Sequence, residues 1–381
     1  MTSEERREGR YQRRKAKRQK RKEESNKEYG DYDKAISMPA LIKAYRVCRK
    51  GTSWKPSVQR YGANLLKNSY KQHMLLVNGS DTFKGFYTFD VYERGKKRAI
   101  RAVHISERTI QKSISKNSFV PMLSNAFIYD NYASLKGKGT ALAIDRMTDF
   151  LHWWYRRHGN EGYVICGDFK NYFGSIDHNE VIRIIKRSFT DPRFAEYTAT
   201  AIAHYPEGLG LGSEENQIYA MALPNDIDHY IKDKKGIKTY SRYNDDFRLI
   251  CRTKEEAKAL LEEIRELSRL KHITLHPTKT QIVKLSHGFN YLKTRFILTG
   301  SGKVIRIPNK NRYKRERRKL KALAEDNRSG EITKEYIEEH YKTWRGQLFP
   351  KKKQIKYKHF NCYRCIQNMD AYYKKIMEGV I

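Results

Sequence analysis

Residues 163–178 read YVICGDFKNYFGSIDH and are the most informative segment of the sequence. Its first half is an apolar run with the character of a buried strand, and the run ends in Asp168. A second stretch, TYSRYNDDFRLICR at residues 239–252, has the pattern of a strand, a tight turn and a second strand. Asp245 and Asp246 stand at that turn. If the two stretches are neighbours in one sheet, Asp168 lies beside Asp245, so the sequence predicts carboxylates gathered at one end of a sheet.

Two adjacent acidic residues at a turn are usually no more than exposed turn residues, because Asp is common in turns. The strand-borne Asp168 gives this pair a different context. Neighbouring carboxylates can bridge two divalent cations about 4 Å apart, which together activate a hydroxyl and stabilise a leaving pyrophosphate. Mg²⁺ prefers the oxygens of carboxylates and phosphates. We therefore expect Asp168, Asp245 and Asp246 to hold two Mg²⁺ ions, for which Mn²⁺ can substitute.

The rest of the chain mixes strands and helices without the regular alternation of a parallel sheet. An alternating stretch at residues 86–103 predicts a β-hairpin, and residues 289–298 predict a short strand pair. The helix expected at residues 107–123 should end before Pro121. Other helices are expected at residues 38–51, 139–158, 179–188, 216–232 and 254–270, and in the basic segment from Asn309 onward. This mixture favours an α+β fold.

Composition bounds the class of protein. The 381 residues are 39% hydrophobic and 32% charged, which is enough apolar content to bury a core and excludes wholesale disorder. No apolar run approaches the roughly 18 residues of a membrane span, and the chain opens on charged residues. With five scattered cysteines, these features predict a reduced, cytoplasmic protein without a membrane partner.

The net charge of +35 indicates a polyanionic partner, most often nucleic acid. The first thirty residues hold twelve Lys or Arg and six Asp or Glu, so most of the excess charge lies in the body. The segment from Arg6 to Lys22 has eleven Lys or Arg and almost no apolar residue. We expect residues 1–34 to be a basic arm, flexible or a solvated helix, that touches phosphates or only aids solubility.

Five motifs in order resemble those of bacterial, non-retroviral reverse transcriptases. The likeness runs from about Met38 to Leu348. The motifs are GDFKNYFGSIDH (167–178), GLGLGSEENQIYAMALPNDIDHYI (208–231), RYNDDF (242–247), LHPTKT (275–280) and the primer-grip stretch HGFNYLKTRF (287–296). The resemblance implies a right-hand polymerase, with fingers and an antiparallel palm sheet over residues 35–300 and a helical thumb over residues 301–381. It also implies an RNA template, a DNA or RNA primer and dNTPs as partners.

The resemblance assigns roles to single residues. Asp168 and Asp245 would ligate the metals, with Asp246 in support. Lys279 would protonate the leaving pyrophosphate. Phe173 would be a steric gate that clashes with a ribose 2′-hydroxyl and so selects dNTPs; the alternative is a core phenylalanine.

Two further residues are implied to contact the nucleotide. Arg98 would hold the triphosphate, since a guanidinium suits bidentate phosphate contact, and Lys96, Lys97 and Arg101 compete for that role. Gln217 would line the nucleotide or template pocket.

Within this family the chain resembles the enzymes of diversity-generating retroelements, whose copying is error-prone at template adenines. Leu211 stands before Gly212 where most reverse transcriptases have Gln, and an aliphatic residue there is typical of the retroelement group. The chain departs from the group at Gly210, where Pro is usual, at Asn216, where Ser is usual, and at Lys293, where the primer grip has Gly.

Alternative roles stay open. One is a phage-defence enzyme that copies a structured non-coding RNA, or that extends DNA without a template. Another is an RNA-binding protein on a catalytically weak polymerase scaffold. A bacterial or prophage origin and a basic accessory protein or homo-oligomer are further expectations from the resemblance. The cations of residues 309–323 suit the phosphates of a template–primer duplex, although a solvated helix has the same composition.

Overall fold

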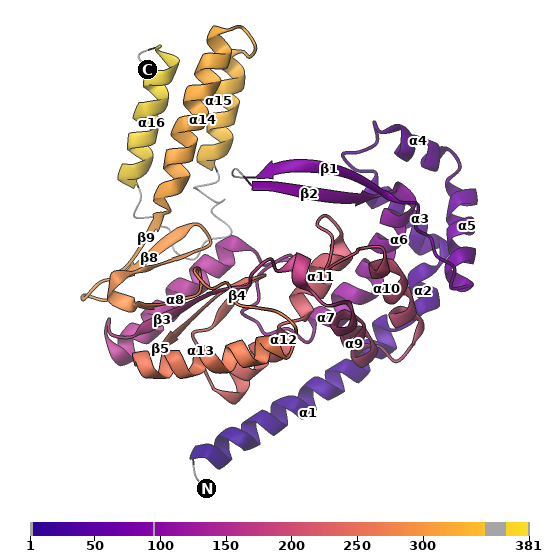
Figure 1. The fold of residues 1–381 in the computed structure, drawn as a ribbon, viewed down its shortest axis with the longest axis horizontal. Helices are drawn as coiled ribbons and strands as arrows, with labels where there is room; N and C mark the ends of the chain where they lie inside the picture. The colour runs from indigo at the N-terminus through magenta and orange to yellow at the C-terminus, as the bar shows by residue number, and fades with distance from the viewer. Residues whose placement is uncertain (1–2, 94–95, 347–362, 380–381) are drawn as a thin grey trace. The chain divides into compact units, whose positions relative to one another are not determined.

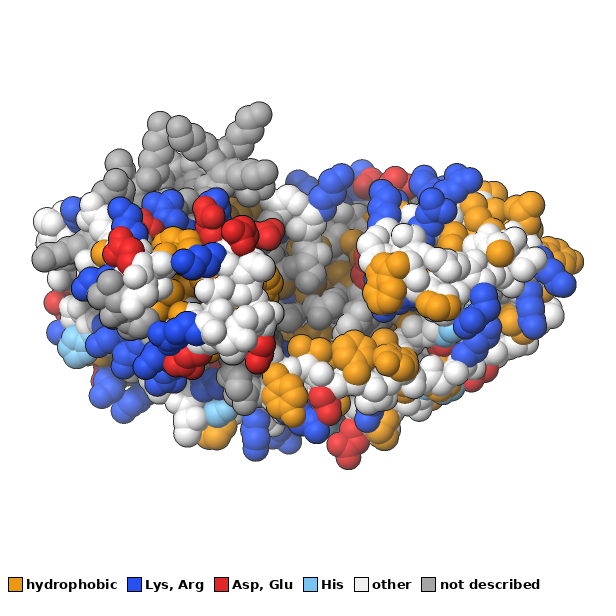
Figure 2. Space-filling view, turned by 90° about the horizontal axis from the view of Figure 1, so that it is seen from above, with side chains coloured by type: hydrophobic (Ala, Val, Ile, Leu, Met, Phe, Trp, Pro, Cys, Tyr) orange, Lys and Arg blue, Asp and Glu red, His pale blue; other side chains and the backbone are white. Residues whose placement is uncertain are grey.

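The computed structural model describes residues 3–93, 96–346 and 363–379 of the chain (Figure 1). Lys and Arg side chains spread across the face shown in Figure 2, as the net charge of +35 leads one to expect. The chain divides into two compact units that are interleaved along the sequence. Unit 1 comprises residues 1–129, 169–236 and 263–276, and unit 2 comprises residues 130–168, 237–262 and 277–381.

The described residues of unit 1 form mainly helices, together with a β-hairpin. The strands β1 (Phe86–Glu93) and β2 (Lys96–Val103) pair antiparallel, as the alternating sequence predicts. The helices are α1 Ser3–Tyr29, α2 Tyr32–Ile36, α3 Met38–Cys48, α4 Pro56–Ala63, α5 Leu65–Val77, α6 Ile105–Ile114, α7 Val120–Ser124, α9 His178–Ser188, α10 Arg193–Ala203, α11 Glu214–Ala222 and α12 Asn225–His229. Short helical turns are η1 Ser115–Phe119, η2 Phe173–Ser175 and η3 Tyr230–Lys234.

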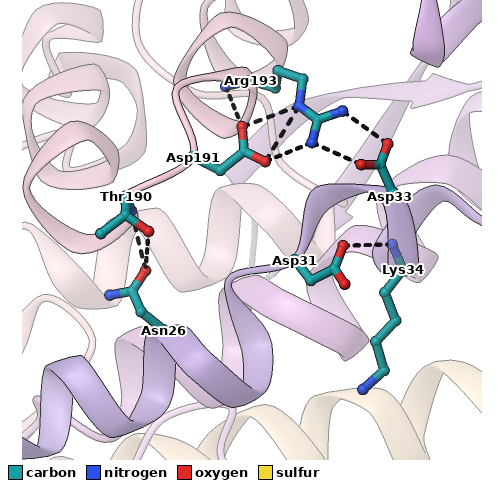
Figure 3. A network of polar contacts seen from close by, with 7 residues as sticks. All are labelled: Asn26, Asp31, Asp33, Lys34, Thr190, Asp191 and Arg193. Carbon is teal, nitrogen blue, oxygen red and sulfur yellow. Dashed lines mark hydrogen bonds and ion pairs between the residues drawn. The ribbon is translucent and has the colours of Figure 1, made fainter.

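The N-terminal segment contains the 27-residue helix α1 and the short helix α2. Near the end of α1, the Asn26 side chain accepts a hydrogen bond from the Thr190 backbone N–H at 3.1 Å. Next to it, the Arg193 guanidinium bridges Asp191 and Asp33, with N–O distances of 2.8–2.9 Å (Figure 3). The described part of this segment is therefore helical and is held to unit 1 by polar contacts.

Two predicted helices differ from the structure. The helix expected to end before Pro121 continues past it, because α6 runs through the π-helical turn η1 into α7, whose first turn holds Pro121. Pro121 has no N–H to donate within this continuous helical run, and the π-helical turn just before it is the kind of local irregularity that accompanies such a break in the hydrogen-bond ladder. The helix expected at residues 216–232 is divided into α11, α12 and η3, with Pro224 as the N-cap of α12.

The described strands of unit 2 form two antiparallel sheets. The first has the strand order β4 (Ser241–Tyr243), β5 (Asp246–Cys251), β3 (Tyr163–Asp168), β6 (Gln281–Lys284). The second has the order β7 (Phe289–Tyr291), β8 (Thr294–Leu298), β9 (Val304–Pro308), and η4 (Leu285–His287) joins the sheets. Helix α13 (Lys254–Arg269) follows β5. Antiparallel sheets combined with separate helical segments confirm the expected α+β class.

Helix α8 (Thr140–His158) provides much of the core of unit 2. Its Met147 and Leu151 are fully buried in a cluster that includes Val164 of the first sheet. A buried ion pair joins Asp145 of α8 to Arg306 of β9, with an N–O distance of 3.0 Å and side chains at most 7% exposed. Buried charges of this kind are tolerated only when paired, so this contact fixes α8 against the second sheet.

Among the residues described after β9, three helices run side by side in Figure 1. They are α14 (Lys310–Arg328), α15 (Lys334–Gly346) and α16 (Tyr363–Met377). They share an apolar cluster of their own that includes Leu320, Trp344 and Met369. Within the described ranges, none of the helices combines the length and apolarity that a bilayer span requires.

Candidate active site

Three acidic residues lie at one end of the first sheet of unit 2. Strands β3 and β5 are neighbours, as predicted, and their register pairs Asp168 with Asp246. Asp245 belongs to the two-residue loop that joins β4 to β5. Directly paired residues of antiparallel strands have Cα atoms about 4.5–5.5 Å apart. The sheet partner of Asp168 is thus Asp246, and Asp245 follows one residue earlier in the turn.

The turn between β4 and β5 is supported by buried side chains. Asn244 has a φ of 59°, a left-handed conformation that Asn tolerates better than most residues. The side chain of Arg242, with no exposed surface, donates a hydrogen bond to the Asn244 carbonyl at 3.0 Å. This support holds the turn in one conformation and keeps Asp245 in a defined position.

Lys279 lies against the first carboxylate. Its Nζ is 2.5 Å from Oδ2 of Asp168, and the two side chains are 52% and 16% exposed. The neighbouring Thr280 is within 3.4 Å of the Asp168 backbone N–H and carbonyl. Asp168 and Lys279, which were assigned to the site from separate motifs, are therefore in direct contact.

Asp246 is paired with Arg248, two residues further along β5. The guanidinium NH1 lies 2.5 Å from Asp246 Oδ1, and Nε donates to the Asn290 carbonyl at 2.9 Å. Burial raises the pKa of Asp246 to about 6, an effect that Arg248 opposes and that the nearby Asp168 and Asp245 increase. The three carboxylates therefore interact electrostatically.

The donor set fits a divalent cation. Among the described residues, no group of three His, Cys, Asp or Glu side chains is arranged as a metal site. Asp168 contacts Lys279 and Asp246 contacts Arg248 instead. Three carboxylates at one strand end nevertheless supply the oxygen ligands that Mg²⁺ prefers. A bound cation would compete with Lys279 and Arg248 for these oxygens.

A groove of about 390 Å³ opens in unit 2 beside this group. Arg248 and Lys279 line it together with Gln281, His287 and Arg295. Its cationic lining suits phosphate groups.

Unit 1 carries the other three predicted site residues. Arg98 of β2 is exposed and pairs with Val91 across the hairpin. Side chains two residues apart share a face of a strand, so Arg98 lies on the face of Ile100. A Cβ added to Gly212 would be 3.6 Å from Ile100 Cγ2, which shows that this face adjoins the glycine-rich motif. The competing Lys97 is on the opposite face and pairs with Asp90 at 3.0 Å.

Phe173 is half-buried in η2, whereas Phe169 and Tyr172 beside it are each 3% exposed. The backbone carbonyl of Phe173 accepts a hydrogen bond from Leu209 N at 2.7 Å. Gly208 has a φ of 58°, and a Cβ there would overlap the Phe173 carbonyl. The ring of Phe173 is thus only partly covered, and a glycine is required at position 208 where the glycine-rich motif meets the Phe173 backbone.

The glycine-rich motif is held by residues that the sequence analysis treated only as departures from the family pattern. The half-buried Gln217 is on α11. Asn216 beside it is 3% exposed and donates a hydrogen bond to the Gly210 carbonyl at 2.8 Å. A Cβ at Gly210 would overlap the ring of Tyr205, which explains why a larger residue is absent there.

Comparison with protein families identifies the chain. The family described as "Reverse transcriptase (RNA-dependent DNA polymerase)" matches residues 84–296, more than half of the sequence. The chain belongs to the reverse transcriptase family. It is an RNA-directed DNA polymerase, and its domain implies a right-hand polymerase fold that acts on an RNA template, a primer and dNTPs. Reverse transcriptase domains generally use divalent metal ions such as Mg²⁺. Comparison with curated proteins gives no match.

The reverse transcriptase has a tight turn with left-handed backbone conformations at its primer-grip stretch. Strands β7 and β8 pair Tyr291 with Thr294, and the two residues between them, Leu292 and Lys293, have φ values of 48° and 66°. Left-handed values at both positions are typical of a tight hairpin and favour glycine. The resemblance led us to expect glycine at position 293, where this chain has Lys293. The left-handed φ at this position explains why glycine is favoured there.

Arg248 is the main site residue of this reverse transcriptase that the sequence analysis missed. A signal was present, because residues two apart in a strand share a face and Arg248 follows Asp246 by two. A basic residue within an apolar strand run also calls for a partner, and Asp246 is that partner.

Proposed function

We propose that the enzyme copies RNA into cDNA by nucleotidyl transfer with two divalent cations held by Asp168, Asp245 and Asp246. The observation that carries the proposal is the register that pairs Asp168 with Asp246 and leaves Asp245 in the adjoining turn. Bound Mg²⁺ would lower the pKa of the attacking hydroxyl and neutralise charge on the phosphates. The three carboxylates would orient the ions, with Mn²⁺ as a substitute.

Lys279 is proposed as the proton donor to the leaving pyrophosphate. Its exposed ammonium lies at the edge of the carboxylate group, in contact with Asp168. An ammonium in this position can give a proton to a phosphate oxygen as the bond to the leaving group breaks.

The residues of unit 1 are proposed to handle the nucleotide. Arg98 would bind the triphosphate, supported by its position on the hairpin face that adjoins the glycine-rich motif. Phe173 would exclude the ribose 2′-hydroxyl, supported by its half-buried ring. Gln217 would contact the nucleotide or template.

We further propose fingers and palm over residues 35–300 and a thumb over residues 301–381. Helix α14 supports the thumb assignment, because it is strongly basic and only a few of its residues, such as Leu320 and Leu323, are buried. The exposed cations would contact the backbone of the template–primer duplex, whose A-form geometry is recognised through phosphates and 2′-hydroxyls.

For the biological role, we propose a diversity-generating retroelement with error-prone copying, in a bacterial or prophage host. The half-buried Leu211 supports it, because a leucine there cannot make the hydrogen bond of the usual glutamine. A role in phage defence with a structured RNA, and a partnership with a basic accessory protein or a second copy, are the alternatives for experiment.

The test is primer extension on a defined RNA template with Mg²⁺, followed by sequencing of the products. Asp245→Ala and Asp246→Ala should each reduce extension at least about 100-fold, because each removes a carboxylate that holds the cations. Phe173→Ala assayed with rNTPs reports on the proposed gate. Undiminished extension by both aspartate variants would contradict the metal assignment.

The products separate the biological alternatives. Template-matched cDNA with errors concentrated at adenines supports the retroelement role. Faithful or repetitive cDNA favours phage defence, and sequences unrelated to the template indicate untemplated synthesis. RNA binding without synthesis on any template would favour the catalytically weak scaffold.

A further inference from the structure

Helix α1 is anchored to the rest of unit 1 along one face. Arg14 and Arg18 contact the two carboxylate oxygens of Asp233 at 2.9 and 2.6 Å. Toward the helix start, Glu8 pairs with Lys234 at 2.9 Å. At the other end, Asn26 is fixed at the loop before α10 (Figure 3). These contacts span most of the helix, so its orientation within unit 1 is defined.

The opposite face of α1 carries a row of cations. Arg6, Arg10, Arg13, Lys17 and Lys20 follow one another at spacings of four, three, four and three residues, which places them on one face of a helix. All five are exposed. At 1.5 Å per residue the row is about 21 Å long. We call these five residues the α1 basic row.

Four of the five residues of the α1 basic row take no part in the ion pairs that anchor the helix. Arg10, Arg13, Lys17 and Lys20 form no ion pair with an acidic side chain in the described part of the chain, in contrast to Arg14 and Arg18. Like charges three and four residues apart destabilise a helix by a few tenths of a kcal/mol per pair. The row thus carries a cost to folding that a polyanion would offset.

We propose that the α1 basic row binds the phosphate backbone of the RNA that the enzyme copies, at a site separate from the carboxylate group; this rests on the proposed RNA-templated function. The row contains no apolar or aromatic side chain, whereas protein interfaces have an apolar, aromatic-rich centre. Protein–nucleic acid interfaces are polar and strongly positive. A helix that lies on a membrane needs an apolar face, and the face of α1 opposite the row is docked on unit 1.

The experiment compares two full-length variants that lose the same charge. The first, Arg13→Gln/Lys17→Gln/Lys20→Gln, removes three cations of the α1 basic row. The control, Arg252→Gln/Lys254→Gln/Lys258→Gln, removes three exposed cations at and near the start of α13, where Glu255 and Glu256 lie between them. Affinity for a fluorescent hairpin RNA without a primer end is measured by anisotropy over a series of salt concentrations. Circular dichroism confirms that both variants remain folded.

The row variant should bind the RNA about 10- to 100-fold more weakly at 0.1 M salt, with a salt dependence lower by about 2 in log–log slope. The control variant should lose less than about 3-fold, because Glu255 and Glu256 lie among its cations and offset their charge. Equal losses of RNA affinity in the two variants would overturn the proposal. It would also be overturned if the row variant bound RNA as before but lost affinity for an acidic polypeptide such as polyglutamate. If the triple variant unfolds, Lys17→Gln alone must still lower the slope.

The binding assay requires no synthesis, so it separates this proposal from the proposed function. Asp245→Ala should bind the hairpin RNA as the unmodified protein does. A protein that binds RNA through the row but makes no cDNA would refute the polymerase mechanism and leave the row intact as an RNA-binding surface.

Discussion

Burial changes the ionisation of a carboxyl group in helix α6. Glu107, in the first turn of α6, is 5% exposed and accepts a hydrogen bond from Lys84 N at 3.2 Å. Burial is the main cause that raises the pKa of its carboxyl to about 7, from an ordinary value of 4.5. Glu107 is therefore largely protonated in the folded protein at pH values where an exposed glutamate is ionised.

This carboxyl should make stability fall as the pH rises. Between pH 4.5 and 7 the folded state keeps a proton that the unfolded state has lost, so a higher pH favours unfolding, by about 3 kcal/mol in total. Glu107→Gln removes the effect. Chemical unfolding at several pH values should show that the free energy of unfolding of Glu107→Gln rises relative to that of the unmodified protein between pH 4.5 and 8. Glu196→Gln, on the exposed face of α10, is the control, and parallel pH curves for Glu107→Gln and the unmodified protein would refute the idea.

Strand β5 shows how a secondary-structure element assembles a site. Its two-residue period places Asp246 and Arg248 on one face, and its antiparallel register brings Asp246 to Asp168. Gly167 of β3 is part of the same design, because a Cβ there would overlap the ring of Phe247. Close pairing of the two strands at the carboxylates thus depends on a residue without a side chain.

Loss of one partner of the Arg248–Asp246 pair should reduce the free energy of unfolding more than loss of both partners. Arg248→Met leaves a partly buried carboxylate without its cation and should lower the free energy of unfolding by about 3–5 kcal/mol. The double variant Asp246→Asn/Arg248→Met, which leaves neither charge, should regain part of that loss. Denaturant unfolding of both variants and of Asp246→Asn completes the cycle. A double variant as unstable as the sum of the single ones would show that the pair has no coupling.

On the scale of the whole chain, the apolar clusters are divided between segments. The cluster of α8 and the two sheets has no residue in common with the cluster of α14, α15 and α16. The last strand, β9, ends at Pro308, just before α14 begins. The C-terminal helices can therefore be removed without opening the core of the sheets.

Deletion of residues 310–381 should leave a protein that unfolds cooperatively, because the core around Met147 and Val164 is retained. Its affinity for a template–primer duplex should fall at least about 10-fold, since the basic helices are lost. Calorimetry and duplex binding by anisotropy check the two parts. Loss of the cooperative transition would show that the two clusters depend on each other, and unchanged duplex affinity would remove the thumb assignment.

The local elements and the chemistry of the site follow from short stretches of sequence. Alternation predicted the β1–β2 and β4–β5 hairpins, an apolar run ending in Asp168 predicted β3, and the order of five motifs predicted a reverse transcriptase. These features are encoded in neighbouring residues, whose spacing and type are enough to specify them.

The long-range features depend on the packing of distant segments and are seen only in the folded chain. The register that opposes Asp168 to Asp246 rather than Asp245, and the docking of α1 through Asp233, depend on residues far apart in the chain. The basic α1 sequence has no apolar face that would predict docking, because polar contacts from distant segments hold it. Such contacts depend on how the rest of the chain packs, and this is why the local pattern did not contain them.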